Sequence, residues 1–191
     1  MCIRDSCISG WTCYTINLVK HKVYGLDEYY TNFDPGSGGA LDAAIAGAFK
    51  KGKPVFSYYW TPTGLMGKVD LVQLEEPAYD NACWTKMMAV VEKIKADGPD
   101  AYTDTCASAY VNMALTKSAS TTFANKKSNK KIVDFIRAYS VPTPDVNRSL
   151  AFYMDESGGD MEATAVNFLK GSDSWTKWVP ADVAKKVKAS L

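Results

Sequence analysis

The chain has 191 residues, of which 47% are hydrophobic, which is enough for one sizeable core or for two small lobes. Its 22 basic and 21 acidic residues give a net charge of +1, and this balance, without a basic stripe, argues against a nucleic-acid-binding protein. No apolar run approaches the roughly 20 residues of a transmembrane helix, so we expect no membrane span.

The first six residues, Met1–Ser6 (MCIRDS), resemble a translated sequencing adapter and lack the apolar core of a signal peptide. We therefore leave residues 1–6 out of the fold prediction and expect that the natural N-terminus, with any export signal, precedes this sequence. Without Cys2, four cysteines remain, and an even number is compatible with two disulfides. The single histidine, His21, lies between two lysines, so we interpret it as a surface residue and expect neither a zinc site nor a His-based catalytic set.

The first half of the chain alternates helical and extended patterns. A helix is predicted to begin near Thr12 or Cys13, and the aromatic run Tyr29–Phe33 predicts a short strand. Ser37 is the expected N-cap of an amphipathic helix that ends at Gly52. The apolar residues of this helix recur at helical spacing on one face: Leu41, Ala44, Ile45, Ala48 and Phe49.

Three further runs predict strands because they are rich in β-branched and aromatic or alternating apolar residues: Val55–Trp60, Asp70–Leu74 and Ala109–Leu115. A second amphipathic helix lies between the last two runs and ends at Gly98-Pro99, with its apolar face formed by Trp84, Met87, Met88, Val91 and Ile94. This order of strands and helices predicts an α/β fold with a parallel or mixed sheet.

The second half of the chain is predicted to be almost entirely helical. Its helices have the following expected first residues or caps: Ser128, Thr143 before Pro144, Asp160 and Pro180. One helix presents an apolar face made of Ile132, Phe135, Ile136 and Tyr139. The basic cluster beside it, Lys126, Lys127, Lys130 and Lys131, is interpreted as a solvated face. We expect an absent N-terminal segment to cover the apolar faces of these helices.

Two aromatic motifs support the functional hypothesis: Gly10-Trp11-Thr12-Cys13 and Tyr58-Tyr59-Trp60-Thr61-Pro62. Each places a tryptophan where an element meets a loop, which is a common position for ligand contacts in α/β proteins. A tryptophan ring attracts a cation that cannot donate hydrogen bonds, such as a quaternary ammonium group. Backbone N–H groups at a turn that enters a helix suit a carboxylate. On the residues alone, the alternative is that both tryptophans only pack in the core or at its rim.

These motifs belong to a longer pattern between Cys7 and Trp84, made of the runs GWTCYTIN, YGLDEYYTNF, GSGGALDAAIAGAFKKGKPV and YYWTPTGLMGKVDLVQLEEPAYDNACW. The pattern resembles the periplasmic glycine betaine/proline betaine-binding proteins of ABC importers. The rest of the chain, to Leu191, is similar in layout and less so in its residues. The resemblance implies an α/β fold of the type II periplasmic binding protein class, a two-lobed clamshell. Residues 7–107 would form the second lobe, and residues 108–191 the mostly helical C-terminal portion of the first lobe.

Position by position, the resemblance also implies a ligand site. Trp11 and Trp60 match two walls of an aromatic box around a trimethylammonium group. Thr12 and Cys13 match positions whose backbone N–H groups bind the ligand carboxylate. The remaining walls of the box have no counterpart in this sequence, so we expect the chain as it stands to bind betaines poorly.

The same resemblance implies two disulfides. Cys7 and Cys13 match a disulfide that fixes the tryptophan-bearing loop in some members of the family. Cys83 and Cys106 lie where a second disulfide would close the second lobe, although Asp104–Ser108 departs from the proline-containing pattern of the family.

The functional prediction is an extracytoplasmic solute receptor, not an enzyme, that binds glycine betaine or a related quaternary ammonium or sulfonium osmolyte. It would deliver the solute to an ABC permease, act as a monomer without cofactor, metal or nucleic acid, and reside in the periplasm or be anchored outside the cytoplasm. Two alternatives stay open. One is an aromatic-rich carbohydrate-binding module, and the other is a small-amine enzyme with Cys13 as nucleophile, for which no histidine base lies in a motif with Cys13.

Other prominent residues are predicted to be structural. Trp84 should be buried against the helix around Leu41–Phe49 or against the sheet, and Trp175 and Trp178 should dock the C-terminal tail. The pair Glu75-Glu76 is interpreted as a hinge-side or surface feature. Because side chains alternate along a strand, Tyr58 and Tyr59 should not both face a cleft.

Overall fold

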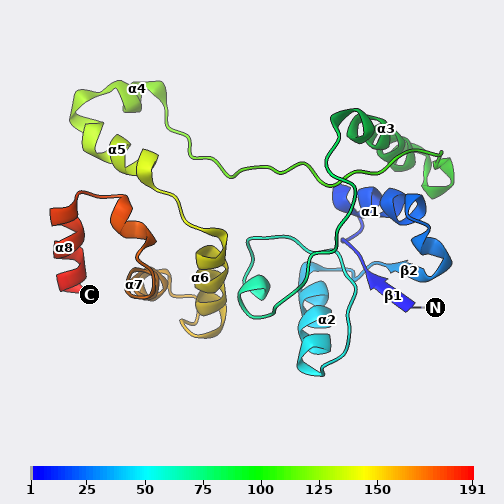
Figure 1. The fold of residues 1–191 in the computed structure, drawn as a ribbon, viewed down its shortest axis with the longest axis horizontal. Coiled ribbons are helices and arrows are strands. Elements are labelled where there is room, and N and C mark those ends of the chain that lie inside the picture. Colours follow the sequence, from blue (N-terminus) through cyan, green and yellow to red (C-terminus); the bar gives the residue numbers. More distant parts are fainter. Residues whose placement is uncertain (1) are drawn as a thin grey trace. The chain divides into compact units, whose positions relative to one another are not determined.

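The computed structural model describes residues 2–191, with side chains described from Ser6 onward, and the chain forms two compact units (Figure 1). The first unit comprises the described residues up to Trp60 together with Leu71–Asn112, and the second comprises Thr61–Asp70 together with Met113–Leu191. The chain therefore passes between units three times. The assignment of residues 7–107 and 108–191 to the two lobes of a clamshell remains a prediction.

The first unit consists of β1 (Cys2–Asp5), α1 (Thr12–Val23), the 3-10 turn η1 (Leu26–Glu28), β2 (Tyr30–Phe33), α2 (Gly38–Lys50), α3 (Asn81–Asp97) and the turn η3 (Pro99–Ala101). Strands β1 and β2 pair in parallel, with Cys2 opposite Tyr30 and Asp5 opposite Phe33. The sequence predicted β2 but no element in residues 1–6. Backbone groups form the ladder, so this segment can add a strand whatever the origin of its side chains.

Helix boundaries in the first unit follow local signals that the sequence displays. The Ser37 hydroxyl accepts a hydrogen bond from the Ala40 N–H and caps α2, as predicted. Beyond the last turn, Gly52 has a φ of 60°, a left-handed conformation that favours glycine and ends the helix. Asp80 caps α3 in the same way, and Gly98 follows its last residue.

The three other strand predictions, Val55–Trp60, Asp70–Leu74 and Ala109–Leu115, are wrong. Apart from an isolated bridge at Ser57, none of these runs has strand structure in the described part of the chain, where β1 and β2 form the two-stranded sheet. Alternating apolar and β-branched residues favour an extended backbone, but a strand also needs a neighbour to receive its hydrogen bonds. The fold is therefore helix-rich, with a small parallel sheet.

The core of the first unit lies between α1 and α3, which pack side by side (Figure 1). Its buried side chains are Ile16 and Val19 from α1 with Met87, Val90, Val91 and Ile94 from α3. Burying each such side chain contributes about 1.5–3 kcal/mol. Trp84 is half-buried at the edge of this cluster and contacts Tyr79 and Tyr110. It does not pack as predicted against α2, because α3 turns this face toward α1 and the segment around Tyr110.

The second unit is helical, as predicted. It contains the 3-10 turn η2 (Leu65–Gly67), α4 (Thr121–Asn125), the turn η4 (Lys127–Asn129), α5 (Lys130–Ala138), α6 (Thr143–Asp155), α7 (Met161–Gly171), the turn η5 (Ser174–Lys177) and α8 (Ala181–Ser190). No helix among residues 2–191 is both long and apolar enough to cross a membrane.

Of the predicted helix caps in this unit, Asp160 is confirmed, since its carboxylate accepts hydrogen bonds from the Glu162 and Ala163 N–H groups. Ser128 lies instead within η4, and α5 starts after Asn129 without a side-chain cap. Thr143 is the first residue of α6 and not its cap. Prolines on both sides of Thr143 supply helix-compatible φ angles and lack N–H groups, so the first turn needs no capping side chain.

The segment that follows Trp60 is anchored within the second unit by Asn147 of α6. The Asn147 side-chain oxygen accepts hydrogen bonds from the Thr63 N–H at 2.9 Å and from the Thr61 hydroxyl at 3.3 Å. Gly67 lies so close to α6 that a Cβ at this position would overlap the Asn147 backbone. Residues 61–67 are therefore fixed to α6 by hydrogen bonds and by close contact.

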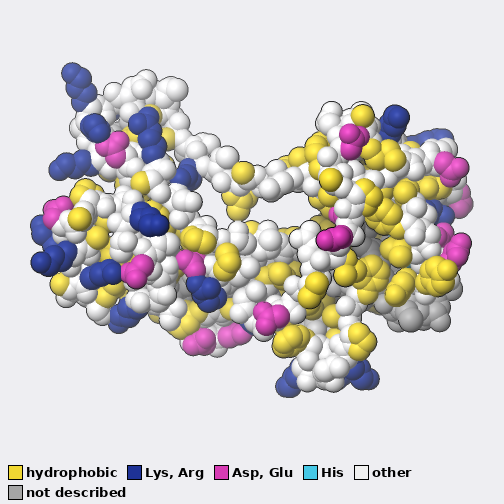
Figure 2. Space-filling view, in the orientation of Figure 1, with side chains coloured by type: hydrophobic (Ala, Val, Ile, Leu, Met, Phe, Trp, Pro, Cys, Tyr) yellow, Lys and Arg dark blue, Asp and Glu magenta, His cyan; other side chains and the backbone are white. Residues whose placement is uncertain are grey.

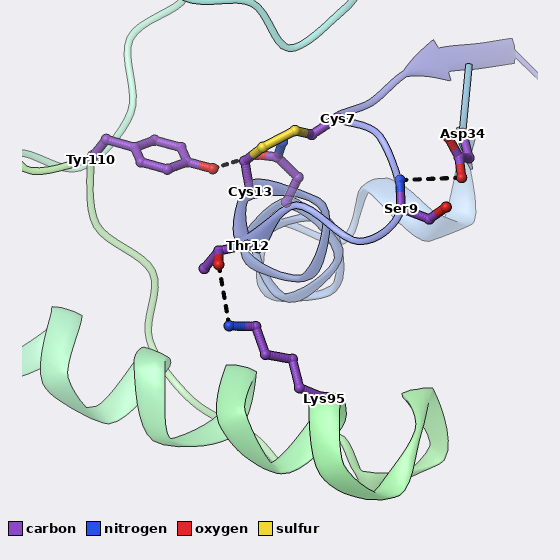
Figure 3. Close-up of a disulfide and its surroundings, with 8 residues drawn as sticks. Cys7, Ser9, Thr12, Cys13, Asp34, Lys95 and Tyr110 are labelled. Carbon is purple, nitrogen blue, oxygen red and sulfur yellow. Dashed lines mark hydrogen bonds between the residues drawn. A yellow bond between two sulfur atoms is a disulfide. The ribbon is translucent and has the colours of Figure 1, made fainter. Parts of the chain in front are cut away.

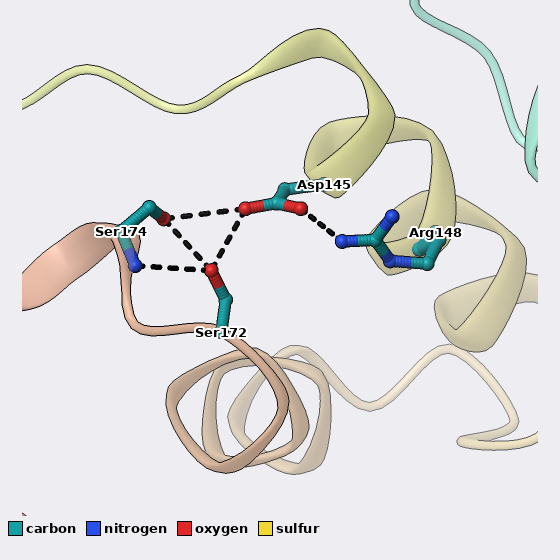
Figure 4. Close-up of polar contacts among 4 residues, drawn as sticks. All are labelled: Asp145, Arg148, Ser172 and Ser174. Carbon is teal, nitrogen blue, oxygen red and sulfur yellow. Dashed lines mark hydrogen bonds and ion pairs between the residues drawn. The ribbon is translucent and has the colours of Figure 1, made fainter.

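A polar cluster joins α6 to the segment after α7 (Figure 4). The Asp145 carboxylate accepts hydrogen bonds from the Ser172 hydroxyl at 2.8 Å and the Ser174 hydroxyl at 3.2 Å, and it pairs with Arg148. Asp145 is buried while Arg148 is exposed, so the serines satisfy the inner side of the carboxylate.

The two C-terminal tryptophans pack this unit together, as predicted. Trp175 is 3% exposed, and its indole N–H donates to the Leu169 carbonyl at 2.9 Å. Trp178 stacks on Phe168, with ring centroids 5.7 Å apart, and donates to the Ser140 carbonyl.

Apolar side chains remain exposed outside the helices and strands, among them Val72, Leu74, Met113 and Leu115. Figure 2 shows hydrophobic side chains gathered on the drawn face of the first unit. In the second unit, the lysines at 126, 127, 130 and 131 are all exposed, as predicted for a solvated face.

Candidate ligand-binding site

The first tryptophan of the candidate site lies on the turn that opens α1. Gly10, with a φ of 90°, allows the chain to turn, and the Trp11 N–H donates to the Ile8 carbonyl at 3.1 Å. The Trp11 side chain is 48% exposed. The next two N–H groups, those of Thr12 and Cys13, belong to the first turn of the helix and have no hydrogen-bond partner within the described residues.

The Cys7–Cys13 disulfide closes the loop that carries Trp11, with the two Cα atoms 5.8 Å apart (Figure 3). Cys7 is fully buried, so the loop is attached to the interior of the unit. At the other side of the loop, the Ser9 N–H donates to the Asp34 carboxylate at 3.2 Å. Hydrogen bonds from Ser9 and Gly36 lower the pKa of Asp34. This disulfide prediction is confirmed.

The second predicted disulfide, Cys83–Cys106, is also present, with a Cα separation of 5.7 Å. It links the first turn of α3 to the segment that leads out of the first unit. The departure from the proline-containing pattern after Cys106 therefore does not prevent the bridge.

The second tryptophan, Trp60, ends the extended run Val55–Trp60 and lies against the first. The ring centroids of Trp11 and Trp60 are 5.7 Å apart, and the rings are inclined by 62° in an edge-to-face arrangement. Trp60 is half-buried, whereas Trp11 is more exposed. The fold thus brings together the two indoles that the resemblance implies as walls of the box, with Thr12 and Cys13 directly after one of them.

Three tyrosines extend this pair into a row of aromatic side chains. Tyr59 stacks on Trp60 at 4.7 Å between centroids, and Tyr58 lies 6.1 Å from the same ring. Tyr110, in turn, lies 5.8 Å from Tyr58. Burial raises the pKa of the Tyr58 hydroxyl. The motif around Trp60 pointed to Tyr58 and Tyr59, but Tyr110 lies in a distant run with no spacing signal, and sequence reasoning missed it.

A partly buried ion pair supports the far end of the row. The Lys20 ammonium, 6% exposed, lies 2.7 Å from a Glu76 oxygen and 4.3 Å from the centre of the Tyr110 ring. The Tyr24 hydroxyl donates to the same carboxylate at 3.0 Å. Burial, and then the neighbouring Glu76, raise the pKa of Tyr24 well above its usual range. Glu76 is thus a half-buried partner of Lys20, while Glu75 is exposed, and a hinge-side role for this pair remains a prediction.

His21 is buried, in contrast to the prediction of a surface residue. It shares one face of α1 with Asn17 and Lys20, at helical spacing, and all three side chains are buried. The Tyr110 hydroxyl donates to the Asn17 side-chain oxygen at 3.1 Å. The basic run Lys20–Lys22 suggested an exposed helix face. In the fold, Glu76 and Tyr110 cover this face through their contacts with Lys20 and Asn17.

The arrangement offers aromatic surface and, within the described residues, two N–H groups without a partner, and it does not leave Cys13 as a free thiol. The Cys13 sulfur is bonded to Cys7 and is therefore not a thiolate. Two hollows lie away from the tryptophans: one of about 510 Å³ lined by Lys126, Lys130 and Arg137 in the second unit, and one of about 380 Å³ beside Glu76 in the first. We base the site on the aromatic row, since these hollows contain neither tryptophan.

Residues 5–171 match the family described as the substrate-binding domain of the ABC-type glycine betaine transport system. The chain belongs to this family. Comparison with curated proteins gives no match. As a substrate-binding domain, the chain has a periplasmic-binding-protein fold and a solute-binding role in transport, and it works with an ABC permease. Proteins of this family act outside the cytoplasm.

Proposed function

We propose that this substrate-binding domain binds glycine betaine, or a related quaternary ammonium or sulfonium osmolyte, against Trp11 and Trp60. It then delivers the solute to its permease without chemical change, as a monomer in the periplasm or anchored outside the cytoplasm. The observation that supports this proposal most directly is the 5.7 Å approach of the two indole rings beside the first turn of α1.

The two tryptophans suit the cationic end of such a solute. A methylated ammonium group cannot donate a hydrogen bond, so it gains most from the negative faces of aromatic rings. A cation within about 6 Å of a ring centroid gains about 0.5–1 kcal/mol at an exposed site and about 2 kcal/mol when water is excluded. Because Trp11 is half-exposed in this chain, the contact should lie toward the lower value.

The start of α1 suits the carboxylate of the same solute. The N–H groups of Thr12 and Cys13 have no partner in the described residues, and the α1 dipole places partial positive charge at this end. Disulfide Cys7–Cys13 holds these groups and Trp11 in one loop. A zwitterion could therefore contact rings and N–H groups together.

The alternatives gain no comparable support. An enzyme that uses Cys13 needs a free thiolate, and Cys13 is bonded to Cys7. A carbohydrate-binding module would use aromatic rings with hydrogen-bonding side chains for hydroxyl groups, and the family match points to betaine transport instead.

The test is a titration of the five tryptophan indole N–H signals by NMR, each assigned with a Trp→Phe variant. Glycine betaine should shift the signals of Trp11 and Trp60 and leave those of Trp84, Trp175 and Trp178 in place. Since the rings are partly exposed, we expect saturation only at about millimolar concentration or above.

Two matched ligands give the control. The compound tert-butylacetate has the shape of glycine betaine without the positive charge, and glycine retains the charge but lacks the methyl groups. Both should shift Trp11 and Trp60 much less than glycine betaine does. An equal response to tert-butylacetate, or no response of these two signals to any quaternary ammonium or sulfonium solute, would overturn the proposal.

A further inference from the structure

We infer that Asp42 is a positioning residue for the Trp60 indole and acts through Tyr59. This inference rests on the proposed function for its effect on binding. Its structural part, the control of the Trp60 ring, can be tested without a ligand.

Asp42 lies in the part of α2 that contains the two buried residues of this helix and its capped first turn. The residues Leu41 and Ile45 of the same helix are both fully buried, and Ser37 caps its first turn. Asp42 itself is half-buried, so its carboxylate is partly protected from water. Helix α2 thus presents a hydrogen-bond acceptor next to its buried face.

Tyr59 connects this acceptor to the candidate site. Its hydroxyl donates to the Asp42 carboxylate at 2.6 Å, a short charge-assisted hydrogen bond. Its ring stacks on Trp60, with centroids 4.7 Å apart and an angle of 24° between the planes. Tyr59 therefore covers one face of the Trp60 indole and is itself held by α2.

Trp60 lies at the end of the run Val55–Trp60, outside the helices and strands, and Ser57 of this run forms an isolated bridge. The Trp60 ring contacts Trp11, Tyr58 and Tyr59. The contact with Tyr59 continues through a hydrogen bond to Asp42 on α2, and this connection preorganises the ring for a ligand.

Three variants separate the hydrogen bond from the other contacts. Tyr59→Phe keeps the stacked ring and removes the donor, and Asp42→Ala removes the acceptor. Asp42→Asn keeps an acceptor oxygen at the same place and removes the charge. Asp97→Ala, an exposed aspartate on α3 in the same unit, is the matched control.

The first readout is the Trp60 indole N–H signal of the ligand-free chain. Tyr59→Phe and Asp42→Ala should shift and broaden it, whereas Asp42→Asn and Asp97→Ala should leave it near its original position. Far-UV circular dichroism of each variant checks that the chain still folds, and Tyr59→Phe, the mildest change, decides the question if Asp42→Ala does not fold. An unchanged Trp60 signal in folded Tyr59→Phe would overturn the inference, as would an equal effect of Asp42→Asn and Asp42→Ala.

The second readout is the dissociation constant for glycine betaine. Loss of one such hydrogen bond should weaken binding by about three- to tenfold in Tyr59→Phe and Asp42→Ala, with recovery in Asp42→Asn. If the unaltered chain does not respond to betaine, the proposed function fails while the ligand-free signal still decides the role of Asp42. If the unaltered chain binds and Tyr59→Phe binds equally well, the inference fails while the proposed function stands.

Discussion

The two units use the same residue type for different purposes. In the second unit, Trp175 is 3% exposed and its N–H group is satisfied by a backbone carbonyl, so the ring acts as a core residue. In the first unit, Trp11 is 48% exposed and stands on a loop closed by a disulfide. All four bridged cysteines belong to the first unit, and the second has none. The comparison teaches that a disulfide can hold the loop of an exposed aromatic ring in place, whereas a buried ring is held by packing.

The largest expected effect comes from removing a tryptophan in each unit. Trp175→Ala should lower the free energy of unfolding of the second unit by about 3–5 kcal/mol, because it leaves a cavity. Trp11→Ala should cost less than about 1 kcal/mol, because much of the ring is already in water. Urea unfolding followed by NMR signals from each unit measures both values. Similar losses for the two variants would break the comparison.

The next effect concerns the larger disulfide loop. The double variant Cys83→Ala with Cys106→Ala should destabilise the first unit by roughly 3 kcal/mol, since the bridge spans 23 residues of sequence and limits the unfolded chain. Amide hydrogen exchange should rise in α3 and remain unchanged in α6 and α7. The pair Cys7→Ala and Cys13→Ala, with a loop of six, should give a smaller change confined to the Trp11 loop. Faster exchange throughout α6 and α7 would argue against independent units.

The smallest effect is a pH dependence within the first unit. Burial and Glu76 raise the pKa of Tyr24 above its usual value of 10.0, so the folded state keeps this proton after the unfolded chain has lost it. Stability from this group is complete below pH 10.0 and is lost as the pH rises above that value. Urea denaturation at a series of pH values above 10.0 should show a steeper loss of stability for the unaltered chain than for Tyr24→Phe. Equal slopes would show that the Tyr24 hydroxyl is not protected.

The sequence predicted those features that depend on neighbouring residues. Helix α2 is one example, since its cap at Ser37 and its end near Gly52 are both local signals. The resemblance to betaine-binding proteins carried the prediction further, to two disulfides and to the pair Trp11 and Trp60. The helix signals are local, and the disulfides and the tryptophan pair came from the resemblance, so none of these predictions required a calculation of distant contacts.

The features that escaped prediction depend on partners far along the chain. The run Ala109–Leu115 has the alternation of a strand, but no signal within it reveals whether a neighbour is present. The burial of His21 depends on the face that α1 shares with Asn17 and Lys20. Tyr110 joins the aromatic row through contacts with residues far along the chain, among them Lys20 and Asn17. Sequence periodicity describes one helix or strand at a time, whereas each of these contacts joins two segments that are far apart in the sequence. Periodicity therefore could not predict them.

The anchoring of residues 61–67 by Asn147 has a consequence for synthesis on the ribosome. The segment directly after Trp60 emerges long before α6, the helix to which it binds. Throughout that interval it has no native partner, and contacts between such distant parts of a chain form slowly. Residues 61–67 can therefore reach their final state only late, when most of the polypeptide has been made.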